Sequence, residues 1–232
     1  MNEPYFIAKN LTKKWTSENF CIEINFSITI NTGEMIALLG PSGCGKSTVL
    51  RLIAGLLPLD KTDGCQLELD AVNLISVPPG KRKISMVFQN HSLFPHLRTD
   101  DNVAYGLRCR GMSKKESRQK AMDLLDRFGL KGFAKRRPES LSGGEAQRVS
   151  LARSLIIKPK LVLFDEPLSA LDAPLRKRLA EDIVCMQKEF GFAGIFVTHD
   201  EDEAKVVAHR IIKMERGKII SEYKNRDYLI KH

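Results

Sequence analysis

The residues best suited to chemistry begin with a glycine-rich stretch that follows an apolar run at residues 35–39. This stretch, called the P-loop below, reads Gly40, Pro41, Ser42, Gly43, Cys44, Gly45, Lys46, Ser47 and Thr48. It matches the phosphate-binding pattern G-x-x-x-x-G-K-S/T, in which glycines let successive backbone N–H groups face one anion. A strand before the pattern and a helix after it are the context that the pattern requires. We expect Lys46 to contact the β- and γ-phosphates of a nucleotide, and the Ser47 hydroxyl to bind Mg²⁺.

Two adjacent carboxylates, Asp165 and Glu166, follow a second apolar run at residues 161–164. We expect Asp165 to complete the Mg²⁺ site with Ser47, directly or through water, and Glu166 to polarise the attacking water. Adjacent acids at the end of a strand can also do no more than cap the next turn. Their presence in one chain with the P-loop favours the catalytic interpretation.

Four apolar runs share one design, because each ends in a residue that can take part in chemistry. Residues 38–39 lead into Gly40, 84–88 into Gln89, 161–164 into Asp165, and 195–198 into His199. Ligands of an open parallel sheet bind beyond the carboxyl ends of its strands, so we expect these residues to meet at one site. Taken alone, Gln89 would be a surface amide and His199 a structural histidine. Their position at strand ends favours a role in the site.

A second stretch able to bind an anion lies at residues 141–148. Ser142 is placed to cap a helix, and Gly143 and Gly144 would expose backbone N–H groups at the positive end of that helix. The chain therefore carries two helix starts suited to phosphate.

The apolar periodicity predicts the elements that must position these residues. Residues 5–35 alternate with period two, as in half-exposed antiparallel strands, whereas residues 90–159 have helical spacing. Further helices are expected at residues 48–57, at 174–190 and after Asp200, and a hairpin turn at 216–217. We therefore expect an α/β fold: a P-loop NTPase core with a mostly parallel sheet, an N-terminal antiparallel β-subdomain and an inserted helical subdomain.

We expect one domain over residues 1–232. Its β-subdomain and P-loop core would comprise residues 1–89 and 160–232, and its helical subdomain residues 90–159.

Composition limits the classes of protein. The 232 residues are 43% hydrophobic and 28% charged, which is typical of a globular domain. Five scattered cysteines predict neither a disulfide framework nor a zinc site, so we expect a reducing compartment. No apolar run is long enough to span a membrane, and no signal peptide is recognisable. The net charge of +9 suits anionic ligands, lipids or nucleic acid, but the basic runs at 81–83, 135–137 and 176–178 lack aromatics and are interpreted as solvated faces.

In order along the chain, these motifs resemble those of an ATP-binding cassette (ABC) ATPase, the nucleotide-binding subunit of a membrane transporter, and the resemblance covers nearly the whole sequence. It implies that two copies pack head to tail, with Ser142, Gly143 and Gly144 closing over the ATP of the partner. It also implies that Asp172, in the run 169–172, lies at the subunit contact. By the same resemblance, His199 contacts the γ-phosphate, and Gln89 links the metal and nucleotide to the transporter contact.

Trp15 occupies the place of the adenine-stacking aromatic in that family, where a tyrosine is commoner. A core or surface role remains the alternative for Trp15. Cys44, beside the Lys46 charge, is a candidate reactive thiol whose alkylation would block nucleotide, with an inert small residue as the alternative.

Several stretches resemble bacterial importers of iron, thiamine, polyamines, sulfate or sugars: 78–82, 87–89, 93–97 and 102–107. The resemblance implies membrane permease subunits as partners, a periplasmic substrate-binding protein acting indirectly, and a peripheral place on the cytoplasmic face of the membrane. The chain is expected to belong to the short importer ATPases that lack a further C-terminal domain. Glu145, where glutamine is common, and residues 98–100, in a region usually more apolar, depart from the family pattern.

Two other functions share part of this pattern. DNA-repair or chromosome-type ABC ATPases have the same motifs, but the interval from Gln89 to Leu141 is too short for their zinc module or coiled coil. We therefore expect no nucleic-acid partner. A phosphotransferase is disfavoured because no acceptor pocket is evident and Glu166 suits water. The cargo is left open, and the direction of import rests on the resemblance alone.

Overall fold

The computed structural model describes residues 4–17, 20–60, 64–90, 92–169, 171–225 and 228. Its strands are β1 (Phe6–Ser17), β2 (Phe20–Ile30), β3 (Met35–Leu39), β4 (Gln66–Leu69), β5 (Val72–Asn73), β6 (Ile84–Val87), β7 (Leu161–Asp165), β8 (Ala193–Thr198), β9 (Arg210–Glu215) and β10 (Lys218–Lys224). Its α-helices are α1 (Lys46–Ala54), α2 (Thr99–Cys109), α3 (Lys114–Arg127), α4 (Gly143–Leu155), α5 (Ala173–Phe190) and α6 (Glu201–Val207). Within these described ranges, none of the helices has both the length and the apolar character of a membrane span.

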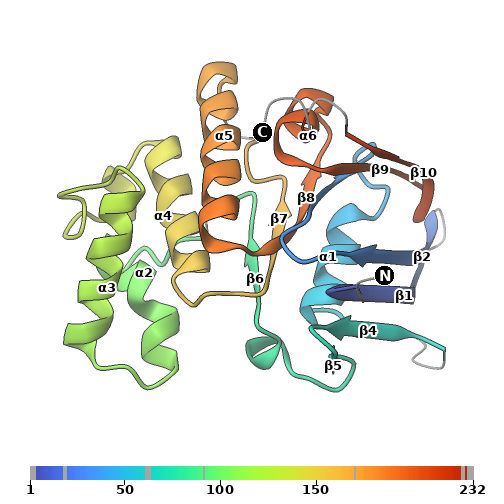
Figure 1. Cartoon of the computed structure of the whole chain (residues 1–232), viewed down its shortest axis with the longest axis horizontal. Coiled ribbons are helices and arrows are strands. Elements are labelled where there is room, and N and C mark those ends of the chain that lie inside the picture. The colour runs from blue at the N-terminus through green and yellow to red at the C-terminus, as the bar shows by residue number, and fades with distance from the viewer. Residues whose placement is uncertain are drawn as a thin grey trace.

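The strands form one sheet in the order β5-β4-β1-β2-β10-β9-β3-β8-β7-β6. The five strands from β9 to β6 run parallel to one another. The N-terminal strands β5, β4, β1 and β2 pair antiparallel. Figure 1 shows this antiparallel part at one end of the molecule and helices α2, α3 and α4 at the other. The predicted α/β fold, with its parallel core, antiparallel N-terminal strands and helical insertion, is confirmed.

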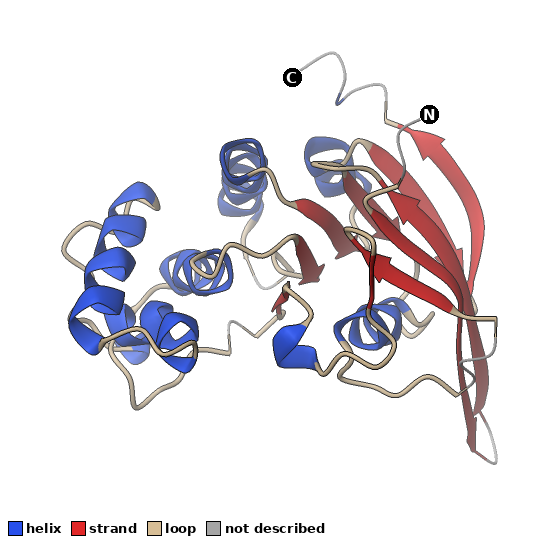
Figure 2. Ribbon diagram, turned by 60° about the horizontal axis from the view of Figure 1, so that its bottom comes forward, coloured by secondary structure: helices blue, strands red, loops and turns tan. Residues whose placement is uncertain are grey.

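The central strands are apolar because both faces of the parallel sheet are covered (Figure 2). Alternate residues of β3 enter two different clusters: Met35, Ala37 and Leu39 face one, and Ile36 and Leu38 face the other. The first cluster contains the buried faces of α4, α5 and α6, and the second contains those of α1, β1 and β2. Helices α1 and α4 therefore pack on opposite faces of the sheet.

Most predicted helix boundaries are confirmed. Ser113 caps α3, with its side chain accepting from the Glu116 N–H, and Gly129 has φ +69° just after the helix ends. Helix α5 runs from the Asp172 cap to Gly191, which takes a left-handed conformation. Asp200 caps α6, and residues 216–217 form the hairpin turn between β9 and β10.

The expected end of the first helix was wrong. Helix α1 stops at Ala54 because Gly55 adopts φ +77°, rather than at Pro58. The Arg82 guanidinium donates to the Leu52 and Ile53 carbonyls at the end of this helix, at 3.3 and 2.7 Å. Arg82 is 7% exposed, and burial lowers its pKa, so the basic run at 81–83 is not wholly a solvated face.

Candidate functional site

The P-loop turns sharply where β3 ends, and at two of its glycines a larger side chain would clash with neighbouring atoms. A Cβ on Gly40 would lie 2.2 Å from the Met214 carbonyl oxygen. Gly45 has φ +104°, and a Cβ there would lie 2.2 Å from the Ile24 side chain. These contacts fix the path of the backbone that leads into α1.

The start of α1 differs from the starts of helices α3 to α6. Those four are capped by Ser113, Ser142, Asp172 and Asp200, whereas no side-chain cap accepts a hydrogen bond at Gly45, which precedes α1. The first N–H groups of α1 thus lack a side-chain acceptor, as expected of a helix start that receives a phosphate.

Lys46 lies inside the loop that it follows. Its side chain is only 3% exposed, and Nζ donates to the carbonyl oxygens of Gly40 at 2.7 Å and Pro41 at 2.9 Å. The ammonium is thus held where the P-loop backbone encloses it, by acceptors that an anionic phosphate oxygen can replace.

Ser47 and Asp165 meet as the sequence predicted. The Ser47 hydroxyl donates to Asp165 Oδ1 at 2.6 Å, joining α1 to the end of β7. Burial raises the pKa of the Asp165 carboxyl, and the Ser47 hydrogen bond and the nearby Arg51 charge lower it in part.

This pair fits Mg²⁺ held jointly with a nucleotide. Among the described residues, no group of three or more histidine, cysteine or acidic side chains could hold a metal ion. One hydroxyl and one carboxylate supply hard oxygen ligands of the kind that Mg²⁺ uses, with phosphate oxygens and water completing its shell. The residues present therefore suit a metal that arrives with the nucleotide.

The buried Asp165 carboxylate yields a stability prediction. Because its native pKa is raised, the folded chain binds the proton more tightly than the unfolded chain does. The free energy of unfolding therefore falls as pH rises through the range between the two pKa values. We expect Asp165→Asn to raise the melting temperature at neutral pH without nucleotide, by roughly 2–4 °C for each kcal/mol gained. Thermal unfolding at several pH values measures this, with the exposed Asp126→Asn as control; a lower melting temperature for Asp165→Asn would contradict it.

Glu166 and His199 lie side by side at the ends of neighbouring strands β7 and β8. Glu166 has φ +46°, a left-handed conformation rarely taken by a glutamate, and its N–H donates to the Val197 carbonyl. Its Oε2 is 3.5 Å from His199 Nδ1. This strained turn directs the carboxylate toward the histidine, and strain of this kind clusters at functional sites.

Gln89 makes no hydrogen bond or ion pair with these residues among those that the structure describes. It is exposed, two residues beyond β6, and β6 is an edge strand separated from β8 by β7. Its side chain makes no hydrogen bond within the described part of the chain. The structure therefore joins Lys46, Ser47, Asp165, Glu166 and His199 through side-chain contacts and neighbouring positions in the chain, and the role of Gln89, which follows the parallel strand β6, stays a prediction.

Trp15 lies on β1 with 43% of its surface exposed. The Lys13 ammonium is 5.4 Å from the centroid of the indole ring. An exposed indole can stack on a base, and the role of Trp15 stays a prediction.

The second anion-binding stretch has the local structure predicted for it. Ser142 and Glu145 form a complete capping box at the start of α4, which explains glutamate at this position. The backbone N–H of Ser142 is the main cause that lowers the pKa of Glu145. Ser142 and Gly143 are exposed, whereas Gly144 is buried against Leu175, whose side chain would lie 2.8 Å from an added Cβ.

Cys44 is less accessible than a reactive thiol should be. It is 5% exposed within an apolar cluster, whereas Cys109 and Cys185 are exposed. We expect alkylating reagents to modify Cys109 and Cys185 first, because a thiol shielded in an apolar cluster reacts slowly. MgATP should slow the labelling of Cys44 further. Mass spectrometry of a labelling time course tests this, and modification of Cys44 as fast as Cys109 would contradict it.

One group of polar residues near His199 was missed. Arg176 was assigned to a solvated basic run, but it is half-buried against Leu171, Asp200 and Glu203. The available signal was the pair of acids that follows His199 at 200 and 203.

Comparison with known proteins agrees with this geometry. The family model described as ABC transporter matches residues 24–169. The Fe(3+) ions import ATP-binding protein FbpC of Brucella abortus (strain 2308) is 44% identical over 219 residues, covering 94% of this chain and 61% of that protein. The spermidine/putrescine import ATP-binding protein PotA of Haemophilus influenzae is 41% identical over 226 residues, covering 97% of this chain and 59% of that protein. The chain thus spans about three-fifths of the length of these curated relatives.

Among solved structures, the ATP-binding cassette MJ0796 is similar along almost its whole length. A dimeric post-hydrolysis state of MJ0796 bound to ADP and Pi superposes with a TM-score of 0.83 at 31% identity, covering 95% of this chain and 99% of that one. A family model that matches well over half of the sequence, and a structural match of this extent, lead to one conclusion. The chain belongs to the ABC transporter family.

Proposed function

We propose that this chain is the ATP-hydrolysing subunit of an ABC importer, acting as a dimer on a separate membrane permease. One observation carries the proposal. The Ser47–Asp165 pair and the Glu166–His199 pair lie at the carboxyl ends of the adjacent parallel strands β7 and β8. The buried Lys46 ammonium lies beside them, at the start of α1, where no side chain caps the helix. These are the groups needed to hold phosphates, hold a metal and direct a water molecule.

Each residue has a task in this reaction. The Lys46 ammonium exchanges its two carbonyl acceptors for β- and γ-phosphate oxygens, while N–H groups of the P-loop and of α1 bind the same phosphates. Ser47 and Asp165 hold Mg²⁺, which neutralises charge on the phosphates when bound. Glu166 orients the attacking water and accepts its proton, and His199 contacts the γ-phosphate. The products are ADP and inorganic phosphate.

The site needs a second copy of the chain. Helices α1 and α4 pack on opposite faces of the sheet, so their two anion-binding starts do not meet within one chain. A head-to-tail pair brings Ser142, Gly143 and Gly144 of each copy to the P-loop of the other, with Asp172 at the subunit contact. The dimeric MJ0796 structures support a dimer of this chain.

Further residues are proposed to contact the adenine of ATP and the permease. Trp15 would stack on adenine, and Gln89 would help to hold the metal and link the metal and nucleotide to the permease contact. Phe94, five residues after Gln89, and the exposed Tyr105 have their ring centroids 4.6 Å apart and offer an apolar surface to a permease helix. The relatives named as import proteins favour uptake, with a periplasmic binding protein acting through the permease. The subunit thus works at the cytoplasmic face of the membrane.

The test is phosphate release by the purified chain. We expect release from ATP only with Mg²⁺, and a loss of about 10²-fold or more in Lys46→Ala, which removes the phosphate-binding charge. Excess EDTA should abolish release, and added Mg²⁺ should restore it. Release that persists in Lys46→Ala or in EDTA, or the formation of a phosphorylated small molecule instead of free phosphate, would contradict the proposal.

A further inference from the structure

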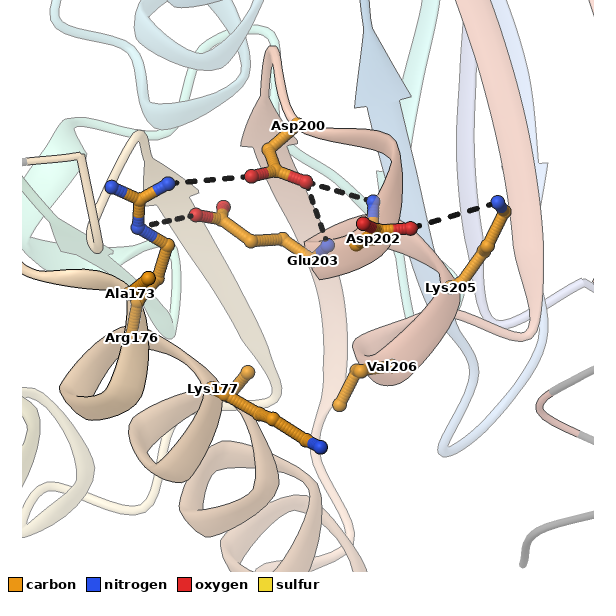
Figure 3. A pocket seen from close by; sticks show the side chains of 9 residues that line it. Ala173, Arg176, Lys177, Asp200, Asp202, Glu203, Lys205 and Val206 are labelled. Carbon is orange, nitrogen blue, oxygen red and sulfur yellow. Dashed lines mark hydrogen bonds and ion pairs between the residues drawn. The ribbon is translucent and has the colours of Figure 1, made fainter.

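Arg176, in the first turns of α5, makes three polar contacts, and Figure 3 draws two of them, those with Asp200 and Glu203. Its Nη2 donates to the Leu171 carbonyl oxygen at 2.9 Å. Its Nη1 lies 3.3 Å from Asp200 Oδ2, and its Nε lies 3.5 Å from Glu203 Oε1. The contacts with Leu171 and Asp200 are hydrogen bonds, and the contact with Glu203 is an ion pair in which Nε makes no hydrogen bond to a described residue. A planar guanidinium can serve Leu171 and Asp200 at once from its two terminal nitrogens, whereas a lysine ammonium presents a single point charge.

The two acids are themselves tied to the residues on either side of His199. Glu203 Oε2 accepts from the Thr198 hydroxyl at 2.6 Å, and that hydroxyl accepts from the Asp200 N–H at 3.0 Å. Thr198 and Asp200 are the immediate neighbours of His199. Both therefore belong to one network of polar contacts with Arg176, on either side of His199.

The remaining contact of Arg176, with the Leu171 carbonyl, connects it to the residues between Glu166 and the proposed subunit contact at Asp172. Leu171 directly precedes Asp172, and Asp172 caps α5 by accepting from the Leu175 N–H at 2.9 Å. Earlier in the same segment, the Ser169 hydroxyl donates to the Glu166 carbonyl at 3.0 Å. Ser169 thus bonds back to Glu166, and Arg176 bonds to Leu171, directly before Asp172.

The charges around this network also depend on Arg176. Asp200, Asp202 and Glu203 lie on one side of the groove of about 540 Å³ between α5 and α6, and Lys177 lies on the other. Asp202 is close to Lys205, with 3.7 Å between the charged atoms. Arg176 is the cation that ion-pairs with Asp200 and with the buried Glu203 among the described residues. Its removal leaves two neighbouring carboxylates without that cation.

We propose that Arg176 is a positioning residue of the ATPase site, which holds the segment ending at Asp172 in register with the loop that carries His199. The role rests on the proposed function of the site. A contact made by a second copy at Asp172 is thereby transmitted to His199, next to Glu166. In this proposal Arg176 does not contact the reacting atoms and acts through these neighbours.

The first test separates catalysis from binding. We expect Arg176→Met to lower kcat for ATP by about tenfold or more while KM stays within about twofold, because misplacing a catalytic group slows the chemical step more than it weakens binding. Arg176→Lys should recover part of kcat. The matched control is Arg178→Met, since Arg178 is exposed two residues further along the same helix. An Arg176→Met enzyme with kcat within about twofold of the Arg178→Met enzyme would overturn the proposal.

The second test does not require turnover. Hydrogen–deuterium exchange without nucleotide should speed up in Arg176→Met at residues 168–172 and 199–205, and stay unchanged in β3 and β7. Faster exchange throughout the chain, or no change in these two segments, would show that Arg176 only stabilises the fold or does not join them. If the wild-type chain releases no phosphate, the proposed function fails, and the exchange pattern still decides whether Arg176 joins the two segments.

Discussion

Glu166→Gln is expected to slow steady-state ATP hydrolysis by about 10²–10³-fold while leaving ATP affinity within a factor of about two. Glutamine keeps the size of the side chain and can still bond to His199, but an amide cannot accept a proton from water. In the proposed site, ATP is bound by Lys46 and the P-loop backbone, which this substitution does not touch. The variant should therefore hold unhydrolysed ATP in a stable dimer.

Two measurements check this. Phosphate release gives kcat, and a fluorescent ATP analogue gives affinity, with the exposed Glu181→Gln on α5 as the matched control. Sedimentation with MgATP should show a dimer that persists far longer for Glu166→Gln than for the wild-type chain. Undiminished hydrolysis by Glu166→Gln would mean that another group activates the water.

The arrangement of the site can be predicted from the sequence because each central strand is a continuous apolar run, which is easy to recognise. Each apolar run is buried on both faces and ends where a polar residue begins, so its carboxyl end can be located to within a residue or two. Parallel strands bring such ends to one edge. Ser47 with Asp165, and Glu166 with His199, meet for this reason.

The sequence does not reveal which member of a charged run is buried. Lys81, Arg82 and Lys83 look alike locally, yet Arg82 alone is buried, because the carbonyls at the end of α1 lie beside it. Arg176 differs from Arg178 in the same way, through partners 24 and 27 positions away along the chain. Tertiary contacts decide which charged residue of a run is buried, and the spacing of residues in the sequence does not reveal these contacts.

Backbone strain is equally invisible in the sequence. Glu166 takes a positive φ although glutamate has no preference for it. The surrounding strands impose it, since the Glu166 N–H bonds to β8 while its carbonyl receives the Ser169 hydroxyl. The expected helix end at Pro58 was wrong for a local reason: Gly55, three residues earlier, ends α1 in a left-handed conformation, which glycine adopts readily.

In the Glu166→Gln background, adding Ser142→Arg is expected to abolish ATP-driven dimerisation while ATP still binds to single chains. Ser142 is exposed at the start of α4, where its backbone and those of the two glycines would meet the partner's nucleotide. An arginine there blocks close approach and also removes the helix cap, which costs about 1 kcal/mol. Ser113→Arg removes the equivalent cap from α3 and is the matched control. Light scattering should show monomers for the Ser142 variant and dimers for the Ser113 variant.

Mixing two defective chains tests whether the site is shared. In the same background, neither Lys46→Ala nor Ser142→Arg should form an ATP dimer alone. A mixed dimer has two sites. One combines the intact Lys46 of the Ser142→Arg chain with the intact Ser142 of the Lys46→Ala chain, and the other combines the two substituted residues. The mixed dimer should therefore trap about one ATP, in its single intact site. A site built within one chain predicts no rescue, because neither variant carries both residues. An equimolar mixture that stays monomeric with MgATP, while the unmixed Glu166→Gln chain dimerises, would therefore overturn the head-to-tail arrangement.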